Sequence, residues 1–266
     1  KEALANTFVP NKISYREEEI RHISNILAPL LRGYQASNIF IYGTCGTGKT
    51  ICSRYVVAQL EEAGKNRIKC VYINTKLKRV GDTEYRLLNR LLRELDEIMP
   101  DTGLPTDILY RRLVTAVEDR GISLVLILDE IDALFKKIGD EFIYSLTRIN
   151  TELNRARIVL IGITNDLSFR DRLDQRIKSS LGEEEVLFKP YNAVQLKNIL
   201  GERATNGFAS NTVTEPAINK CAAIAAQEHG DARKALDLLR VAGEITDRNG
   251  ESIVTEAHVD MAEKKL

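Results

Sequence analysis

One stretch decides the fold of this chain: Gly43-Thr44-Cys45-Gly46-Thr47-Gly48-Lys49-Thr50, which matches the phosphate-binding loop pattern Gly-x-x-x-x-Gly-Lys-Thr in full. It stands between an apolar strand pattern at residues 38–42 and a helical pattern, which is the context that the motif requires. The glycines let the backbone turn until several N–H groups face one phosphate, and the helix N-terminus adds positive potential. The loop therefore predicts a site for the phosphates of a nucleotide.

Two side chains of this loop have chemistry of their own. Lys49 supplies a point charge to the β- and γ-phosphates, and the Thr50 hydroxyl can bind Mg²⁺. We expect ATP or ADP as the ligand, with contacts from all residues of the loop and from Ile51, which continues the helix. The alternative is a glycine-rich turn that binds nothing. Cys45 is either a reactive thiol that acts as a redox switch or a small side chain that the loop tolerates.

Another apolar strand pattern, further along the chain, ends in two carboxylates. Residues 124–128 are all apolar and are followed directly by Asp129 and Glu130. Nucleotide hydrolysis uses one carboxylate to hold Mg²⁺ or its waters and another to orient the attacking water, so we assign Asp129 to the metal and Glu130 to the water. The alternative is that the pair only begins the next helix, which is the role that we expect for Asp132.

The composition limits the class of protein. A chain of 266 residues favours one large and one small domain, and 44% hydrophobic with 29% charged residues is typical of a globular protein. The formal net charge is zero, so contact with nucleic acid requires a local basic patch. No apolar run approaches the roughly 20 residues of a membrane span, and the start at Lys1 is not a signal peptide. The four cysteines include no Cys-x-x-Cys pair, which argues against zinc and favours a reducing cytoplasm.

Short apolar runs alternate with helical patterns through most of the chain. The runs lie at residues 38–42, 70–73, 124–128, 158–163 and 186–188. This alternation predicts an α/β fold, with a five-stranded parallel sheet and helices on both faces. Strand patterns stop after Pro190, and helical patterns follow at about residues 193–205, 215–229, 231–248 and 255–265. We therefore expect a nucleotide-binding base domain at residues 1–189 and a small all-helical lid domain at residues 190–266.

Two helix signals stand apart from this alternation. Ser14-Tyr15-Arg16-Glu17 fits a capping box, which predicts a helix start after an extended arm. Between the second and third strands, helical patterns at about residues 84–98 and 106–119 are separated by residues 100–105, where two prolines break the helix.

Five segments together make the chain similar to the AAA+ superfamily, and within it to the archaeal and eukaryotic origin-recognition and cell-division-control replication initiators. They are residues 43–50, Asp129-Glu130-Ile131-Asp132, Gly162-Ile163-Thr164-Asn165-Asp166, Arg176-Ile177-Lys178-Ser179-Ser180-Leu181 and Gly230-Asp231-Ala232-Arg233-Lys234-Ala235-Leu236. The resemblance implies a P-loop NTPase base with an initiator-type helical insertion at about residues 76–120, a helical lid, and ATP at their junction. In the family a winged-helix domain follows the lid, and this chain ends where that domain would begin.

The resemblance assigns sensor roles to two residues that also stand out physically. Asn165 follows the fourth strand, where a neutral amide can bind the γ-phosphate or the attacking water; the alternative is a loop turn, which Asn favours. Arg233 lies in the first turn of a helix that Asp231 caps, where a cation opposes the helix dipole at a cost of roughly 0.3–1 kcal/mol. A residue that is locally unfavourable in this way often has a functional role. The resemblance makes Arg233 a lid contact to the γ-phosphate. The alternative is an arginine that faces solvent.

Further nucleotide contacts are implied by the resemblance alone. Tyr191, Ile199 and Arg203 are similar to the adenine- and phosphate-side residues of the family's lid, although ordinary packing explains Tyr191 and Ile199 as well. The arm around Val9-Pro10 and Arg16 would close the other side of the base.

The resemblance also makes Arg176 an arginine finger, which would reach the ATP site of a neighbouring subunit. Such a finger contributes about 10³–10⁵ in rate where it operates, so we expect slow hydrolysis from a single chain. The alternative is a salt bridge within the chain.

A basic edge on the insertion is the candidate DNA contact. Its residues are Lys76, Lys78, Arg79, Arg86, Arg90 and Arg93. Lys and Arg that neutralise phosphates give affinity independent of base sequence. The alternative is a solvated helix face on which Glu94 and Glu97 neutralise the arginines.

These observations favour an ATP-controlled replication initiator, a weak ATPase that acts mainly as a switch. Its expected partners are double-stranded origin DNA and the replicative helicase or other initiator subunits, with no membrane, in the cytoplasm at the nucleoid or in a eukaryotic nucleus. A clamp-loader-like ATPase is the second hypothesis, although Gln175-Arg176-Ile177 stands where clamp loaders have Ser-Arg-Cys. A scaffold that is locked with ADP and hydrolyses nothing is the third.

Overall fold

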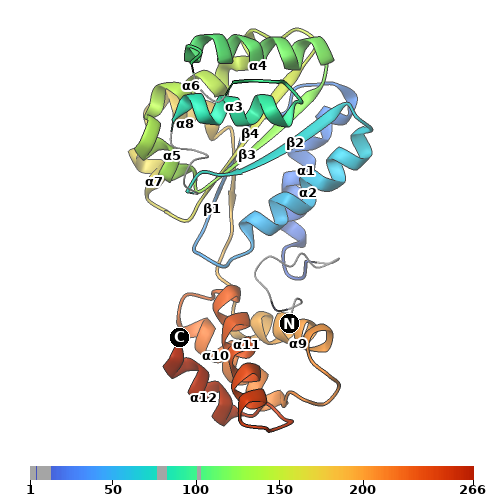
Figure 1. The fold of residues 1–266 in the computed structure, drawn as a ribbon, viewed down its shortest axis with the longest axis vertical. Helices are drawn as coiled ribbons and strands as arrows, with labels where there is room; N and C mark the ends of the chain where they lie inside the picture. Colours follow the sequence, from blue (N-terminus) through green and yellow to red (C-terminus); the bar gives the residue numbers. More distant parts are fainter. Residues whose placement is uncertain (1–3, 5–12, 77–82, 101–102) are drawn as a thin grey trace. The chain divides into compact units, whose positions relative to one another are not determined.

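The computed structural model describes residue 4 and residues 13–76, 83–100 and 103–266 (Figure 1). It divides into two compact units, each made of more than one segment. The sheet unit consists of residues 18–43 and 49–187. The helical unit consists of residues 44–48 and 188–266 together with the described part of residues 1–17. The segment that we predicted to form a lid therefore falls within a single unit.

The sheet unit is built on five parallel strands in the order β2-β3-β4-β1-β5. The strands are β1 (Ile39–Tyr42), β2 (Ile68–Asn74), β3 (Ser123–Asp129), β4 (Arg157–Thr164) and β5 (Glu184–Leu187). Every residue of β3 is buried, as expected for a parallel strand that is covered on both faces. The predicted α/β fold with a five-stranded parallel sheet is confirmed.

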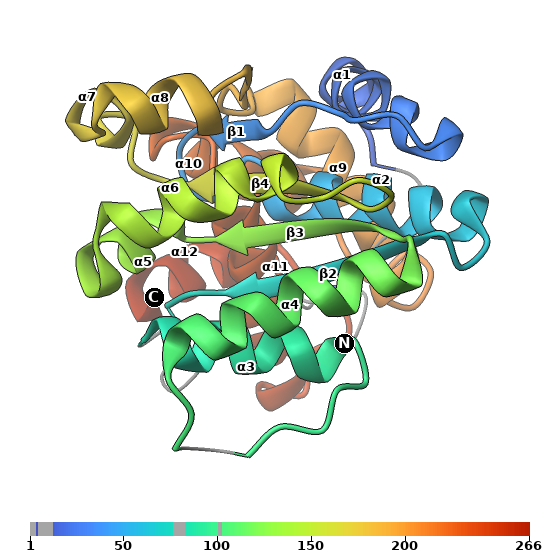
Figure 2. The same cartoon turned by 90° about the horizontal axis from the view of Figure 1, so that it is seen from above.

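Helices cover both faces of this sheet (Figure 2). Those before residue 188 are α1 (Glu17–Leu27), η2 (Ala28–Arg32), α2 (Lys49–Gly64), α3 (Glu84–Glu94), α4 (Thr106–Arg120), α5 (Ile131–Ile138), α6 (Asp140–Arg148), η3 (Ile149–Thr151), α7 (Phe169–Arg172) and α8 (Gln175–Leu181). Buried side chains of α3, α4, α5, α6 and α8 form one apolar cluster with Phe40, Leu124 and Leu126. Val125 and Ile127 alternate with those leucines and point to the other face, where α2 packs on β2 and β3.

The insertion between β2 and β3 contains the two predicted helices, with one difference in length. α3 begins after Thr83, whose side chain accepts the Arg86 N–H, and its leucines are buried against α4. The expected extension of this helix to Ile98 is wrong, because α3 ends at Glu94. Asp96 takes a left-handed conformation, with φ 58°, and turns the chain out of the helix. The side chain of Ile98 is consequently 96% exposed.

The predicted capping box at Ser14 is also wrong. The Ser14 hydroxyl does not accept a helix N–H but donates to the carboxylate of Glu202, at 3.1 Å. Tyr15 adopts φ 65°, so the backbone turns before the helix starts. α1 begins only at Glu17, whose carboxylate accepts the N–H of Tyr15 at 3.3 Å.

The helical unit contains the four helices that the sequence predicts. They are α9 (Ala193–Gly207), α10 (Glu215–Gln227), α11 (Ala232–Arg248) and α12 (Glu256–Lys265). Asn192, Thr214 and Asp231 cap the first three by accepting backbone N–H groups. Their shared core is rich in alanine, which lets the helices approach one another closely. In the described part of the chain, no helix is both long and apolar enough to cross a membrane.

Glu118 on α4 holds the turn that leads into β4. Its carboxylate accepts the backbone N–H groups of Ala156, Arg155 and Asn154 at 2.9–3.2 Å. These bonds, with that of Ala156 the largest contribution, lower the pKa of Glu118 below its usual value. A carboxylate with a lowered pKa in the folded state stabilises the fold above its ordinary pKa and loses that effect as the pH falls through the folded value.

We expect Glu118→Gln to lower the free energy of unfolding at neutral pH, because the amide has one acceptor oxygen and no charge. The difference from the parent should shrink as the pH falls below 4.5, the ordinary pKa, since the parent's carboxyl then also becomes neutral. Denaturant unfolding at neutral and at acid pH measures it, with the exposed Glu18→Gln as control. A difference that stays constant with pH would contradict this role.

Candidate functional site

The phosphate-binding loop owes its turn to two glycines. Gly46 and Gly48 have φ 68° and 93°, conformations that a residue with a Cβ rarely adopts. The Thr47 hydroxyl donates to the Thr44 carbonyl at 2.9 Å and closes the turn. α2 begins directly after the loop, at Lys49, so the free N–H groups of its first turn lie beside the loop.

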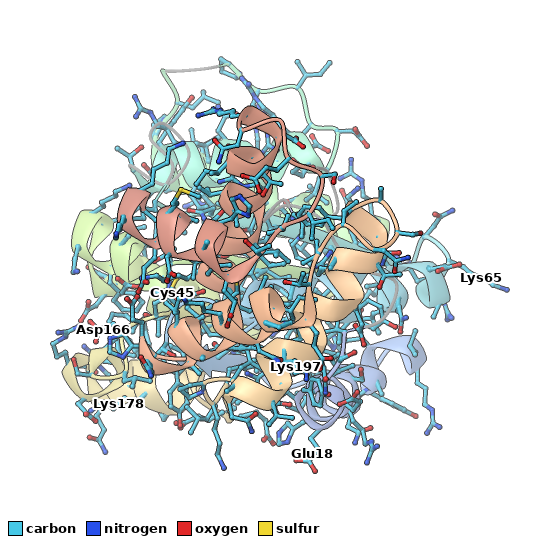
Figure 3. The ribbon with its side chains drawn as sticks, turned by 90° about the horizontal axis from the view of Figure 1, so that it is seen from below. Glu18, Cys45, Lys65, Asp166, Lys178 and Lys197 are labelled. Carbon is cyan, nitrogen blue, oxygen red and sulfur yellow. The ribbon has the colours of Figure 1, made fainter. Side chains whose placement is uncertain are left out.

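The lysine of this loop lies inside it. Lys49 is only 4% exposed, and its Nζ donates to the carbonyl of Gly43 at 2.8 Å. A full positive charge at the N-terminus of a helix, here α2, favours an anion such as a phosphate. Cys45, which Figure 3 labels, is exposed, and Ile51 is half-buried in the first turn of α2.

The two residues that we assigned to the metal are in direct contact. Thr50 Oγ1 donates to Asp129 Oδ2 at 2.8 Å, although 79 positions separate them in sequence. Oδ1 of the same carboxylate accepts the N–H of Glu130 at 3.0 Å, and Asp129 is only 6% exposed. A carboxylate and a hydroxyl are hard oxygen donors of the kind that Mg²⁺ prefers when nucleotide phosphates supply further ligands. The donor set therefore fits the expected cation.

Tyr72 on β2 is a third member of this group that the sequence analysis missed. Its hydroxyl donates to Asp129 Oδ2 at 2.8 Å. Burial, followed by the charge of Asp129 and the hydrogen bond to it, raises the pKa of Tyr72 to about 12, so the phenol stays a donor at neutral pH. A tyrosine in an edge strand carries no motif, so no sequence signal distinguishes it from a packing residue.

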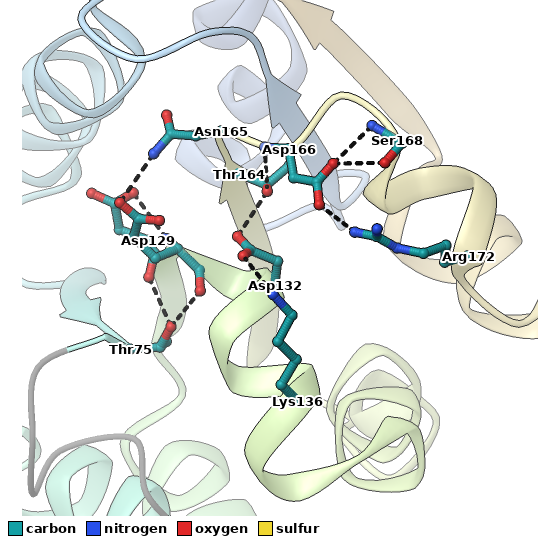
Figure 4. A network of polar contacts seen from close by, with 10 residues as sticks. Thr75, Asp129, Asp132, Lys136, Thr164, Asn165, Asp166, Ser168 and Arg172 are labelled. Atoms are coloured by element: carbon teal, nitrogen blue, oxygen red, sulfur yellow. Dashed lines mark hydrogen bonds and ion pairs between the residues drawn. The ribbon is translucent and has the colours of Figure 1, made fainter.

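The predicted water-orienting carboxylate and the predicted sensor amide also meet. Asn165 Nδ2 donates to Glu130 Oε1 at 3.0 Å (Figure 4). Glu130 has φ 58°, an unfavourable conformation for a residue with a Cβ, at a cost of about 1–3 kcal/mol. Thr75 supports this turn, because its hydroxyl donates to the carbonyls of Asp129 and Glu130 at 3.0 and 2.6 Å. A strained residue held by a second side chain is typical of functional sites.

A second polar network fixes the loop that contains Asn165. The Thr164 hydroxyl donates to Asp132 at 2.8 Å, and it accepts the N–H of Asp166 at 3.1 Å (Figure 4). The pKa of Asp166 is lowered by its hydrogen bonds, first from the Ser168 hydroxyl and then from Arg172. Asp132 lies in the first turn of α5, which confirms its predicted place at a helix start.

Within the helical unit, the predicted lid residues occupy different environments. The guanidinium of Arg16 lies 4.0 Å from the ring centroid of Tyr191, and its Nη2 donates to the carbonyl of Lys189 at 2.5 Å. Arg203 is buried, and that burial lowers its pKa. Ile199 packs against the apolar core of the unit.

The predicted sensor arginine stands at the start of α11. The N–H of Arg233 donates to the Asp231 cap at 2.7 Å. Its guanidinium Nη1 lies 3.7 Å from Cys45 Sγ, which belongs to the same unit. Val9 and Pro10 lie outside the described residues. The nucleotide contacts of all these residues stay predictions.

Arg176, the predicted finger, lies on α8 with its side chain 74% exposed. Its Nε donates to Asp174 Oδ1 at 3.1 Å, and this partner raises the pKa of Arg176. The guanidinium also lies 5.4 Å from the ring centroid of Tyr144 on α6. The salt bridge that we considered as the alternative is therefore present, but so exposed a pair contributes little to stability, and the finger role stays a prediction.

The candidate DNA residues of α3 share one exposed face. Arg86, Arg90 and Arg93 are all exposed, on the side away from the buried leucines. Arg90 forms an ion pair with Glu94, whereas Glu97 pairs with Arg120 of α4. Glu94 thus offsets the charge of Arg90, as the alternative predicted in part. Lys76 is exposed, and Lys78 and Arg79 lie outside the described residues.

Two family models match this chain. An AAA domain matches residues 32–171, which include the whole phosphate loop and the acidic end of β3. The Cdc6 AAA+ ATPase-type lid domain matches residues 197–264, which correspond to the helical segment after β5.

Curated relatives and solved structures match along the full chain. It is 49% identical over 266 residues to ORC1-type DNA replication protein 1 of Sulfurisphaera tokodaii, covering 100% of this chain and 66% of the relative. It is 47% identical over 273 residues to the ORC1-type DNA replication protein of Pyrococcus abyssi, covering 100% and 64%. The structure of the Aeropyrum pernix ORC1 protein in complex with DNA matches with a TM-score of 0.89 and 42% identity, over 99% of this chain and 68% of that one. The chain thus spans slightly less than two thirds of the curated relatives' length.

We expect Lys49→Ala to weaken ATP binding by roughly 10- to 100-fold, because a hydrogen bond to a charged group contributes about 1.5–3 kcal/mol. A fluorescent ATP analogue titrated into the protein measures the change. The matched control is Lys69→Ala on β2, which removes a lysine outside the loop. Unchanged affinity in Lys49→Ala would remove the loop from the binding site.

Proposed function

Because the chain belongs to the ORC1- and Cdc6-type family of AAA+ DNA replication initiators, we propose that it is a nucleotide-controlled switch. It binds ATP, hydrolyses it slowly, binds origin DNA, and helps to recruit or load the replicative helicase. The nucleotide state changes the grip on DNA or the contact with the helicase. The enzyme activity is thus weak and serves to reset the switch.

The observation that supports this proposal is that two adjacent carboxylates, Asp129 and Glu130, have different partners. Asp129 faces Thr50, the last residue of the phosphate loop, whereas Glu130 faces Asn165 at the end of β4. These different partners support the assignment of Asp129 to a cation and of Glu130 to the attacking water. If Asp129 and Glu130 served only to begin the next helix, neither carboxylate would need a side-chain partner from a distant segment of the chain.

In the proposed mechanism, Lys49 and the loop N–H groups bind the phosphates and neutralise their charge. Thr50 and Asp129 would hold Mg²⁺, which supplies further neutralisation of the phosphate oxygens when it is bound. Glu130 orients the attacking water and accepts its proton. Asn165 holds the Glu130 carboxylate in place and offers its amide to the γ-phosphate or the water.

Residues of the lid and of a second subunit complete the proposed site. Arg203 and Arg233 contact phosphates, and Tyr191 and Ile199 lie on the adenine side. Arg176 is supplied to a neighbouring subunit, for which its exposed position on α8 is suitable. A chain that uses its own Arg176 elsewhere lacks this cation in its own site, and slow hydrolysis follows.

The exposed arginines of α3 support the proposed contact with duplex DNA. The net charge of the chain is zero, so attraction to phosphates depends on where the cations are placed. Arg86 and Arg93 lie on the outer face of a helix whose inner face is anchored in the core, which gives a rigid support for phosphate contacts.

We expect Glu130→Gln to slow single-turnover ATP hydrolysis by about 10²-fold or more, because the amide cannot accept the proton of the attacking water. ATP affinity should stay near that of the parent, since the amide keeps the size of the Glu130 side chain and the bonds of Glu130 go to Asn165 and Thr75. Quenched-flow hydrolysis and equilibrium binding measure the two quantities. A parent protein that keeps ADP through purification and shows no single-turnover hydrolysis would instead favour the ADP-locked scaffold.

We expect reversal of Arg86 and Arg93 to Glu to weaken duplex DNA binding and to flatten its salt dependence. Each lost phosphate contact should reduce the slope of log affinity against log salt by about 0.9. Fluorescence anisotropy at several salt concentrations measures the slope. The control reverses the exposed Arg21 and Arg32, which alters the net charge equally. An equal effect of both double variants would mean that only net charge matters, and no effect of either would favour a clamp-loader-like role.

A further inference from the structure

The carboxylate that is expected to hold Mg²⁺ has more hydrogen-bond donors than a P-loop alone provides. Asp129 Oδ2 accepts from Thr50 and from Tyr72, each at 2.8 Å, while Oδ1 accepts from the backbone of Glu130. The Glu130 bond belongs to the turn, and the Thr50 bond belongs to the loop. The Tyr72 bond comes from a different strand and is the one that the motifs do not explain.

The sheet register places Tyr72 so that its side chain reaches Asp129. In the parallel pairing of β2 with β3, Tyr72 lies beside Ile127 and Asn74 lies beside Asp129. Asp129 is thus two residues further along than the partner of Tyr72, a distance of about 6–7 Å at roughly 3.3 Å per residue. A tyrosine ring that leans along the strand spans this distance with its hydroxyl at the carboxylate, whereas a shorter hydroxyl side chain would not.

The ring itself is held from the side of the phosphate-loop helix. The guanidinium of Arg54, in the second turn of α2, lies 5.1 Å from the ring centroid of Tyr72. Such a cation–π contact favours one ring position over others. The tyrosine therefore connects α2, through Arg54, with the end of β3, through Asp129. This is a second connection beside that of Thr50.

We propose that Tyr72 is a positioning residue for the metal site, which fixes the Asp129 carboxylate in the orientation that Mg²⁺ needs. This role rests on the proposed function, in which Thr50 and Asp129 hold Mg²⁺ with ATP. A cation at this place competes for the oxygens of Thr50 and Asp129, whereas the Tyr72 hydroxyl reaches Asp129 Oδ2 from β2. Its bond to Oδ2 persists when the Thr50 hydroxyl turns to the metal, so the carboxylate keeps its rotamer. Partners that orient metal ligands in this way typically change metal affinity by 10–100-fold when they are removed.

The test is Tyr72→Phe, which removes one oxygen and keeps the ring beneath Arg54. We expect about tenfold weaker affinity for Mg²⁺ in the presence of ATP, seen as a shift in the Mg²⁺ dependence of the fluorescence of an ATP analogue. Mn²⁺ in place of Mg²⁺ gives a second readout, since electron paramagnetic resonance counts the bound ion directly. Binding of the analogue in EDTA should match the parent, and a cooperative thermal unfolding transition without nucleotide should show that the variant is folded.

Tyr42→Phe is the matched control. The hydroxyl of Tyr42, on β1 of the same sheet, also donates to a carboxylate, Glu185 on β5, at 3.4 Å. Tyr42→Phe likewise removes one phenol oxygen, but Glu185, the partner of that oxygen, is not an expected metal ligand. The Mg²⁺ dependence of analogue binding should therefore stay that of the parent. An equal shift in both variants would show a general effect of losing a phenol and would overturn the proposal.

The remaining outcomes separate this proposal from the proposed function. If the parent shows Mg²⁺-dependent ATP binding and Tyr72→Phe has the same Mg²⁺ dependence, the positioning role is wrong and the proposed function stands. If Tyr72→Phe weakens analogue binding equally with Mg²⁺ and with EDTA, the tyrosine supports the loop and not the metal, which also overturns the role. If the parent binds no nucleotide with or without Mg²⁺, the proposed function itself fails.

Discussion

The hydrogen bond from Thr50 to Asp129 is the contact on which the rest of the site depends. Its two ends belong to the first turn of α2 and to the end of β3, whereas the strand that precedes α2 is β1. β4 lies between β1 and β3 in the sheet, so α2 must cross over β4 before it packs on β2 and β3. That crossover brings a loop after one strand to the acidic end of another, and without it the two motifs would be separate.

Parallel pairing then brings further groups to the same edge of the sheet. Asp129 pairs with Ile163, so Asn165 follows β4 only one residue beyond the level at which Glu130 follows β3. The left-handed turn at Glu130 aims its carboxylate at that amide, and Thr75 offsets the strain by donating to both carbonyls of the turn. Asp129 thus has a partner from the neighbouring strand β2, Tyr72, and Glu130 has one from the residue after β4, Asn165.

Charged side chains outside this site form exposed ion pairs. The pairs Arg176–Asp174, Arg90–Glu94 and Arg120–Glu97 all lie at the surface, where water screens the attraction and each pair contributes little to stability. Such weak pairs can be exchanged for the phosphates of DNA or for those of a neighbouring subunit's nucleotide at little cost. An exposed ion pair is therefore compatible with a binding role, and the proposed functions of Arg90 and Arg176 depend on this.

The sequence alone determined the features whose cause is local. Eight contiguous residues specify the phosphate loop, apolar runs specify the five strands, and periodicity with capping residues specifies the four helices after β5. Tertiary structure decided what depends on residues far apart in the chain. The partner of Ser14 is 188 positions away and that of Tyr72 is 57 positions away, so neither pattern nor spacing could reveal them. The end of α3 at Glu94 likewise depends on a left-handed turn at Asp96, which helical periodicity does not report.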